Sequence, residues 1–201
     1  MKTRYLVNVV LAATLATLAT SAMAEDKKPA AAPSEEKMMK KWEAAAAPGA
    51  AHKALDALAG EWEIVNKTWM APDAPPLETK AKCTTRWILG GRFLQADFEG
   101  EFLGKPMKGL GLTGYDNLRK KYTRLWIDTG GTAMSTSEGT AGADGKSFTF
   151  TRKMDGPMTG EKDKLLKYTI QIVSHDKHIF EMFDLSNGKS TRMMEMVYTR
   201  K

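Results

Sequence analysis

R-W-I-L-G-G-R-F-L at 86–94 decides the fold class, together with G-L-G-L-T-G-Y-D-N at 109–117 and R-L-W-I-D at 124–128. Apolar and polar residues alternate in short runs that show no helical period. Glycine pairs or an Asp-Asn dipeptide separate the runs. This pattern is typical of consecutive antiparallel strands joined by tight turns, so we predict an all-β fold.

The pattern continues to the C-terminus and predicts about ten strands. They start near positions 61, 80, 92, 107, 121, 133, 147, 165, 178 and 192. Turn dipeptides such as Asp116-Asn117 and Asp144-Gly145 separate them, so sequential strands should pair as hairpins. An open sheet of this length would leave unpaired edges. We therefore predict a closed antiparallel up-and-down β-barrel for residues 60–201.

The N-terminal segment has the pattern of an export signal. Lys2 and Arg4 precede an apolar run, and Ala22-Met23-Ala24 supplies the small residues that signal peptidases require. We predict a signal peptide at 1–24 with cleavage after Ala24, which places the mature protein in the periplasm or outside the cell. The apolar run is too short for a membrane span, so we do not expect a transmembrane protein.

Residues 25–33 are polar and rich in proline, which predicts a flexible linker. The helical segment 34–59 follows, with Ser34 as the N-cap and Pro48-Gly49 as an interruption. We expect this segment to cover the barrel and its apolar side chains, Met38, Met39 and Trp42, to pack on it. The alternative is an envelope protein partner that docks on residues 34–47.

Charge and cysteine content exclude several classes of protein. The formal net charge is +6, but the lysines alternate with acidic residues and form no basic stripe, so we predict no nucleic-acid partner. Cys83 is the only cysteine, so no intramolecular disulfide can form. Its position within a predicted strand favours a small buried side chain over a nucleophile.

Several motifs together resemble an exported bacterial family, the domain-of-unknown-function fifteen-seventy-nine family. They are P-G-x-x-H-K (48–53), L-A-G-E-W (58–62), I-L-G-G-R-F-L (88–94), G-x-x-G-Y-D-N (111–117), W-I-D (126–128), G-T (131–132) and Y-T-R-K (198–201). The resemblance covers residues 48–201 and implies a lipocalin-like (calycin) barrel without an assigned activity. It also implies that Trp62 of a G-x-W motif closes one end of the barrel and that Arg200 packs across its ring.

Six residues are candidates for ligand binding: Trp87, Arg92, Tyr115, Arg124, Trp126 and Asp128. Arg124, Trp126 and Asp128 alternate onto one face of a strand. If that face points inward, an Arg–Asp pair beside an indole could anchor a carboxylate or another polar head group. If it points outward, the same residues form ordinary surface ion pairs. The sequence leaves both possibilities open.

Other motifs do not predict chemistry. G-x-G-x-x-G at 109–114 precedes another strand rather than a helix, so we interpret its glycines as allowing a strand to bend and not as a nucleotide site. The three histidines and Cys83 lack metal-ligand spacing, and no nucleophile motif is present. We predict no metal, no cofactor and no catalytic residues.

The sequence therefore favours a binding protein that holds a small apolar or amphipathic ligand, such as a lipid-like molecule, in the barrel. We expect an interior that side chains do not fill completely. Three alternatives remain. They are an enzyme that uses the same pocket with Arg92 or Arg124 and Asp128, an envelope interaction module, and a haem-binding barrel with His178 as the ligand.

Overall fold

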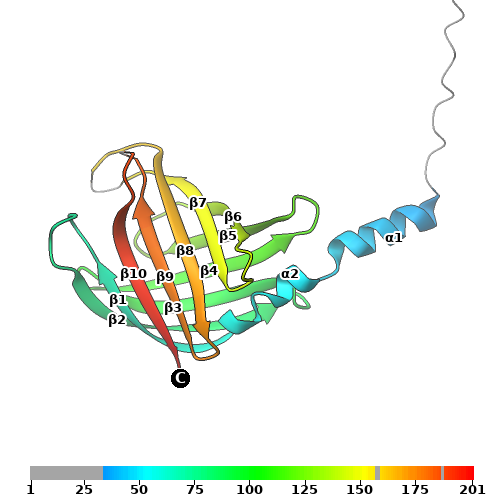
Figure 1. Cartoon of the computed structure of the whole chain (residues 1–201), viewed down its shortest axis with the longest axis horizontal. Helices are drawn as coiled ribbons and strands as arrows, with labels where there is room; N and C mark the ends of the chain where they lie inside the picture. Colours follow the sequence, from blue (N-terminus) through cyan, green and yellow to red (C-terminus); the bar gives the residue numbers. More distant parts are fainter. Residues whose placement is uncertain (1–33, 157–158, 187) are drawn as a thin grey trace, which may run out of the picture.

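The computed structural model describes residues 34–156, 159–186 and 188–201. The signal peptide predicted for 1–24 and the linker predicted for 25–33 lie outside the described residues. Ten antiparallel strands form a closed barrel (Figure 1). Each strand pairs with its neighbours in sequence, and β1 closes the barrel against β10. The predicted up-and-down barrel is confirmed.

The helices are α1 (Glu35–Ala46), α2 (Ala50–Lys53) and the 3-10 helix η1 (Asp56–Leu58). The strands are β1 (Gly60–Thr68), β2 (Leu77–Ile88), β3 (Phe93–Phe102), β4 (Lys105–Asp116), β5 (Lys121–Asp128), β6 (Ser135–Ala141), β7 (Ser147–Met154), β8 (Lys164–Ser174), β9 (Lys177–Asp184) and β10 (Thr191–Arg200).

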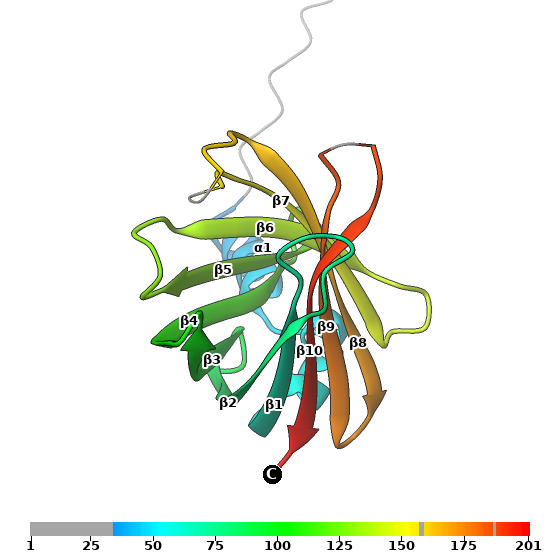
Figure 2. The same ribbon diagram turned by 90° about the vertical axis from the view of Figure 1, so that its left-hand side faces the viewer.

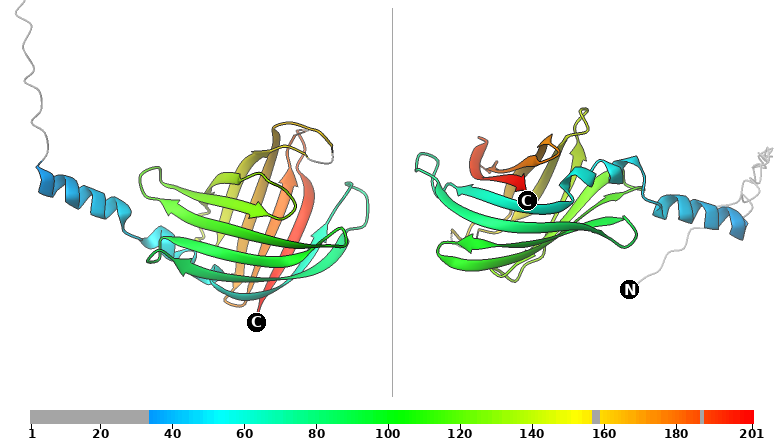
Figure 3. Two further views of the ribbon diagram at one scale, coloured as in Figure 1. Left: turned by 180° about the vertical axis from the view of Figure 1, so that it is seen from behind. Right: turned by 90° about the horizontal axis from the view of Figure 1, so that it is seen from below.

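Helix α1 projects away from the barrel (Figures 1 and 3). The exposed fractions of Met38, Met39 and Trp42 are 49%, 54% and 67%. The prediction that these side chains pack on the barrel is therefore wrong. The chain is extended at Ala47, so α1 is not folded back, and Asn117 bonds only the carbonyl oxygens at the helix end. Docking of a partner on 34–47 stays a prediction.

Residues 50–59, which we call the plug, cover one end of the barrel. Leu55 and Leu58 are only 1% and 7% exposed because they insert between the strands. The Tyr122 hydroxyl donates to the carbonyl oxygen of Ala51, and the Trp62 indole donates to that of Leu58. The plug is thus part of the domain. Figure 2 looks onto the opposite end of the barrel, with α1 behind it.

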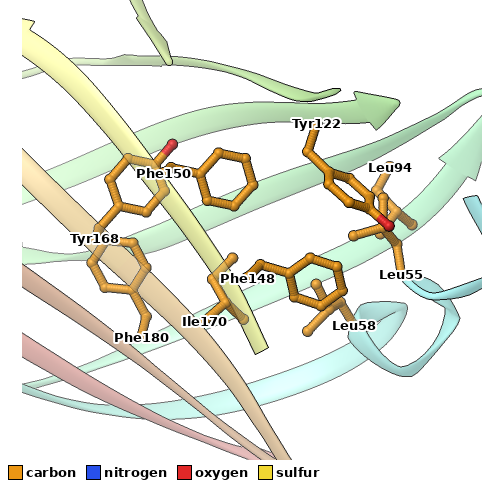
Figure 4. Packing of buried hydrophobic residues seen from close by; sticks show 9 residues of the cluster. All are labelled: Leu55, Leu58, Leu94, Tyr122, Phe148, Phe150, Tyr168, Ile170 and Phe180. Carbon is orange, nitrogen blue, oxygen red and sulfur yellow. The ribbon is translucent and has the colours of Figure 1, made fainter. Parts of the chain in front are cut away.

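Two groups of buried side chains occupy the interior. The first lies beside the plug and contains Leu55, Leu58, Leu94, Tyr122, Phe148, Phe150, Tyr168, Ile170 and Phe180 (Figure 4). The second contains Trp62, Ile64, Cys83 and Phe98. Within the first group, the rings of Phe150 and Tyr168 stack at a centroid distance of 4.9 Å. Aromatic rings therefore fill much of the barrel.

No helix among residues 34–156, 159–186 and 188–201 combines the length and the apolar character that crossing a bilayer requires.

Candidate ligand-binding site

An interior cavity of about 50 Å³ lies where the two buried groups meet. Its lining residues come from the plug and from β2, β3, β4, β5, β8, β9 and β10. They are Leu58, Cys83, Thr85, Leu94, Ala96, Thr113, Arg124, Ile170, His178, Phe180 and Tyr198. The cavity can hold a few water molecules or a compact polar group, whereas pockets for larger ligands measure roughly 300–1,000 Å³. The interior is tighter than expected because the rings of β7 to β9 fill it.

Arg124 faces this cavity, which decides between the two orientations left open by the sequence. Its strand, β5, is flanked by β4 and β6, and Arg124 lies opposite Thr113 on one side and Ser137 on the other. The guanidinium carbon lies 5.5 Å from the ring centroid of Tyr168 and 5.7 Å from that of Phe180. The arginine thus projects into the barrel between aromatic rings.

The guanidinium of Arg124 has no anionic partner among residues 34–156, 159–186 and 188–201. Its Nε is buried and makes no hydrogen bond within the described part of the chain. No ion pair among these residues includes Arg124 either. A buried donor without an acceptor costs free energy, so this arginine is available for an anion from outside the chain.

His178 forms part of the cavity wall and is 7% exposed. Its ring stacks on that of Tyr198 with a centroid distance of 4.1 Å and meets the Trp62 ring edge-on with a centroid distance of 4.4 Å. Its Nδ1 has no hydrogen-bond partner among the described residues. Burial lowers the pKa of His178 from 6.5 to about 3, helped by the charges of Arg124 and Arg200. The imidazole is therefore neutral near pH 7, and the positive charge of the cavity belongs to Arg124.

The surroundings of His178 leave no room for a macrocycle of the size of haem, because two aromatic rings lie against the imidazole and the cavity is small. Within the part of the chain that the structure describes, no three His, Cys, Asp or Glu side chains are grouped so that they could share a metal ion.

Cys83 also lines the cavity, with an exposed fraction of 5%. Burial raises the pKa of its thiol, and the Sγ lies 3.6 Å from the Thr85 hydroxyl oxygen. A thiol with a raised pKa is a poor nucleophile near pH 7. Cys83 thus contributes a small uncharged surface to the cavity.

Trp126 and Asp128 point inward on the same strand as Arg124, but they contact each other instead of the arginine. The Trp126 indole nitrogen donates to Asp128 Oδ2 at 2.6 Å, and the Gly130 amide donates to Asp128 Oδ1 at 2.8 Å. The Arg–Asp pair considered from the sequence does not form, because the indole and the following turn already hold the carboxylate. The enzyme hypothesis assumed that Arg124 and Asp128 act together on a polar substrate group, and this arrangement does not support it.

The glycines of the G-x-G-x-x-G stretch make room for the same indole. They lie in β4, and a Cβ atom on Gly109 would be 2.3 Å from the ring of Trp126. At Gly111 the nearest ring atom would be 3.3 Å away. The tryptophan ring packs flat on the strand and leaves no room for a side chain at Gly109. The glycines are therefore explained by this contact and not by the strand bend that we expected.

Trp87, Arg92 and Tyr115 lie near the plug and do not line the cavity. The Trp87 indole donates to Asp56 of the plug at 2.9 Å, and Arg92 donates to the carbonyl oxygen of Leu89 at 3.2 Å. Tyr115 lies edge-on to His52 and Tyr122. The structure therefore brings these three residues to the closed end and separates them from Arg124.

Trp62 and Arg200 meet at the closed end of the barrel. The guanidinium carbon of Arg200 lies 4.3 Å from the Trp62 ring centroid. Its nitrogens donate to carbonyl oxygens of the plug and of the β8–β9 turn, namely those of Ala57, Ala59 and His175. Gly60 has a φ of +141°, and a Cβ there would collide with the guanidinium. This arginine has a structural role.

Sequence reasoning missed Arg152, Ser137 and Tyr168, which lie close to Arg124. Ser137 shares a hydrogen bond with the Tyr168 hydroxyl, and Arg152 donates to Ser135. The period-two alternation F-x-F-x-R at 148–152 places Arg152 on the face of Phe148 and Phe150. This alternation is the feature of the sequence from which an inward-facing Arg152 could have been predicted.

The comparisons with known proteins agree with this fold. The barrel is similar to the crystal structure of Rv2717c from M. tuberculosis, with a TM-score of 0.57, 17% identity, and coverage of 77% of this chain and 99% of that one. It is also similar to the S-type phycobiliprotein lyase CPES from Guillardia theta, with a TM-score of 0.54, 12% identity, and coverage of 84% and 98%. At these identities the likeness concerns the fold alone.

A search of curated protein sequences gives no match. The family model described as "Protein of unknown function (DUF1579)" matches residues 47–200, which comprise the α1–α2 connection, the plug and all ten strands of the barrel. The chain therefore belongs to the DUF1579 family.

Proposed function

We propose that this protein binds a small amphipathic molecule whose anionic head group occupies the interior cavity and contacts Arg124. The observation that carries the proposal is the Arg124 side chain, which lines the cavity and whose buried Nε lacks a partner among the described residues. An anion there would replace the hydration that the guanidinium lost on folding. Charge-assisted and bidentate hydrogen bonds are the strongest that such a group makes.

The other walls of the cavity suit a head group of this kind. Thr85 and Thr113 add hydroxyl groups, and His178, neutral near pH 7, adds a ring nitrogen. The cavity volume of about 50 Å³ fits the head group and not a whole ligand. An apolar tail therefore has to displace side chains between the cavity and the end opposite the plug.

Methionines provide that adaptability. Met182, Met194 and Met196 pack beside the buried groups, and Met194 lies opposite Met182 across β9 and β10. Unbranched thioether side chains change rotamer at low cost and adapt to apolar ligands. If the predicted signal peptide is functional, the ligand is one that the protein meets in the periplasm or outside the cell.

The proposal is tested on protein purified from its native compartment by mass spectrometry under non-denaturing conditions. We expect the wild type to carry an additional mass that organic extraction releases as an acid. Arg124→Met should be free of it. Arg86→Met is the matched control, since Arg86 pairs with Asp97 on the outer surface, and this variant should keep the ligand.

Two results would contradict the proposal. One is wild-type protein that shows only its own mass and does not bind added octanoate. The other is Arg124→Met protein that retains the same ligand as the wild type.

A further inference from the structure

A second inward-facing arginine lies near Arg124. Arg152 of β7 donates through one terminal nitrogen to the Ser135 hydroxyl and through the other to the Met154 sulfur, the latter at 3.2 Å. Its Nε is buried without a partner in the described residues, as in Arg124. No ion pair of the described chain includes Arg152.

The strand register brings the two arginines to either side of one serine. Arg124 lies opposite Ser137 in the β5–β6 pair. The β6–β7 pair places Glu138 opposite Thr151, and one further step of this register places Ser137 opposite Arg152. Adjacent strands are about 4.8 Å apart, so the Cα atoms of the two arginines are about 10 Å apart. Long side chains can converge over that distance.

Tyr168 connects the two arginines chemically. Its ring lies beneath the guanidinium of Arg124, and its hydroxyl shares a hydrogen bond with Ser137. Burial lowers the pKa of Arg152, Tyr168 raises it, and the positive charge of Arg124 lowers it. An arginine nevertheless stays protonated in a protein, so the pair repels across the interior.

The other charged side chains near the interior already have partners. Lys164 pairs with Asp184 at 2.8 Å. Arg200 is bonded to three carbonyl groups, and Asp128 accepts from Trp126 and Gly130. The carboxylate of Asp128 favours the charged form of Arg152 but lies beyond ion-pair distance from it. The positive charges of Arg124 and Arg152 therefore have no ion-pair partner in the part of the chain that the structure describes.

Building on the proposed function, we propose that the bound head group carries two negative charges, as a phosphate monoester does, and that Arg124 and Arg152 bind it together. A single carboxylate would neutralise Arg124 and leave Arg152 unmatched. A phosphate monoester presents three acceptor oxygens, which matches two guanidinium groups and the hydroxyls of Ser135 and Ser137. Arg152 does not line the cavity, so it must exchange its contacts with Ser135 and Met154 for phosphate oxygens.

The test compares two probes with the same alkyl chain, octanoate and octyl phosphate. Binding to ligand-stripped full-length protein is measured by isothermal titration calorimetry at pH 8, where the phosphate monoester is a dianion. We expect the wild type to bind octyl phosphate at least about tenfold more tightly, a difference of about 1.4 kcal/mol. Arg152→Gln should reduce this ratio to below about threefold without weakening octanoate, and Arg86→Gln should keep the ratio.

The outcomes separate this inference from the proposed function. Equal affinity for the two probes, or an equal loss of both in Arg152→Gln, overturns the dianion inference and leaves the binding proposal standing. Failure of both probes to bind overturns both proposals. Two results together support both proposals. Arg124→Gln should bind neither octanoate nor octyl phosphate, and Arg152→Gln should bind both without a preference for the phosphate.

Side-chain NMR gives a second readout on the unmodified protein, so the inference does not depend on how a variant folds. The Nε–H groups of Arg124 and Arg152 are buried and have no acceptor among the described residues. Octyl phosphate should shift both Nε–H signals, whereas octanoate should shift only that of Arg124. A phosphate-induced shift at Arg124 alone would overturn the role of Arg152.

Discussion

The closed end and the centre of the barrel each contain a partly buried arginine, yet only the one at the closed end has hydrogen-bond partners among the described residues. At the closed end, Arg200 lies on the Trp62 ring and donates to three carbonyl oxygens. In the centre, Arg124 lies among aromatic rings, and its Nε has no hydrogen-bond partner in the described part of the chain. The same residue type thus has two roles. Arg200 holds the plug to the barrel, and Arg124 is left free for an anion.

The largest expected effect removes the satisfied arginine. Arg200→Met should reduce the free energy of unfolding by about 4 kcal/mol, because it leaves the carbonyl groups of Ala57 and Ala59 unpaired and removes the cation–π contact. Equilibrium unfolding in urea measures this loss. Arg200→Lys, which keeps a charge over the ring, should lose less. A change below 1 kcal/mol would contradict the structural role of Arg200.

The second prediction concerns the tight packing around Trp126. Gly109→Ala should cost about 2–3 kcal/mol of stability, because the new methyl group overlaps a rigid indole ring. Gly111→Ala is the matched control and should cost less, since its Cβ lies at 3.3 Å from the same ring. Urea unfolding of both variants gives the comparison. Equal stabilities would mean that the indole does not lie on Gly109.

The third prediction concerns His178, whose pKa is lowered to about 3 in the folded chain from 6.5. The unfolded chain takes up a proton first as the pH falls below 6.5, so stability is lost from there down toward pH 3. Between pH 7 and pH 5 the loss should be about 2 kcal/mol from this residue. The free energy of unfolding is measured as a function of pH for the wild type and for His178→Leu. The difference between the two slopes gives the contribution of His178.

The comparison with a variant is necessary because burial also lowers the pKa of His52, and the Arg92 charge acts in the same direction. Both proteins retain that contribution, so the difference isolates His178. Identical slopes in the two proteins would show that His178 is not buried in its neutral form. An anion bound near the imidazole favours its protonated form, so it should reduce the pH dependence of the wild-type stability. The measurement therefore also reports on anion binding in the cavity.

Much of the fold follows from the sequence. Every strand begins within three residues of its expected position, because turn dipeptides and period-two alternation are local signals. The position of α1 was not predictable in the same way. Met38 and Trp42 have the spacing of a packed helix face, but the extended backbone at Ala47 directs the helix away from the barrel.

The candidate site was only partly predictable. Alternation placed Arg124, Trp126 and Asp128 on one face, but both faces of β5 carry mixed side chains, so the sequence did not show which face is inside. Asp128 accepts a hydrogen bond from Trp126 and not from Arg124. This choice depends on the side-chain rotamers of these residues, which cannot be predicted from a local sequence pattern. Arg152 has threonine and lysine as neighbours and resembles a surface residue, although its face also carries Phe150.

The most direct test of the contrast between the two arginines is the urea unfolding of ligand-free Arg124→Met. Removing a charge whose Nε is buried without a partner in the described residues, and keeping an apolar stem of similar length, should leave stability unchanged or raise it by up to about 2 kcal/mol. Octanoate, added to both proteins, should stabilise the wild type and not the variant. A loss of several kcal/mol in the ligand-free variant would show that Arg124, like Arg200, is held by the chain itself, and would contradict the proposed anion site.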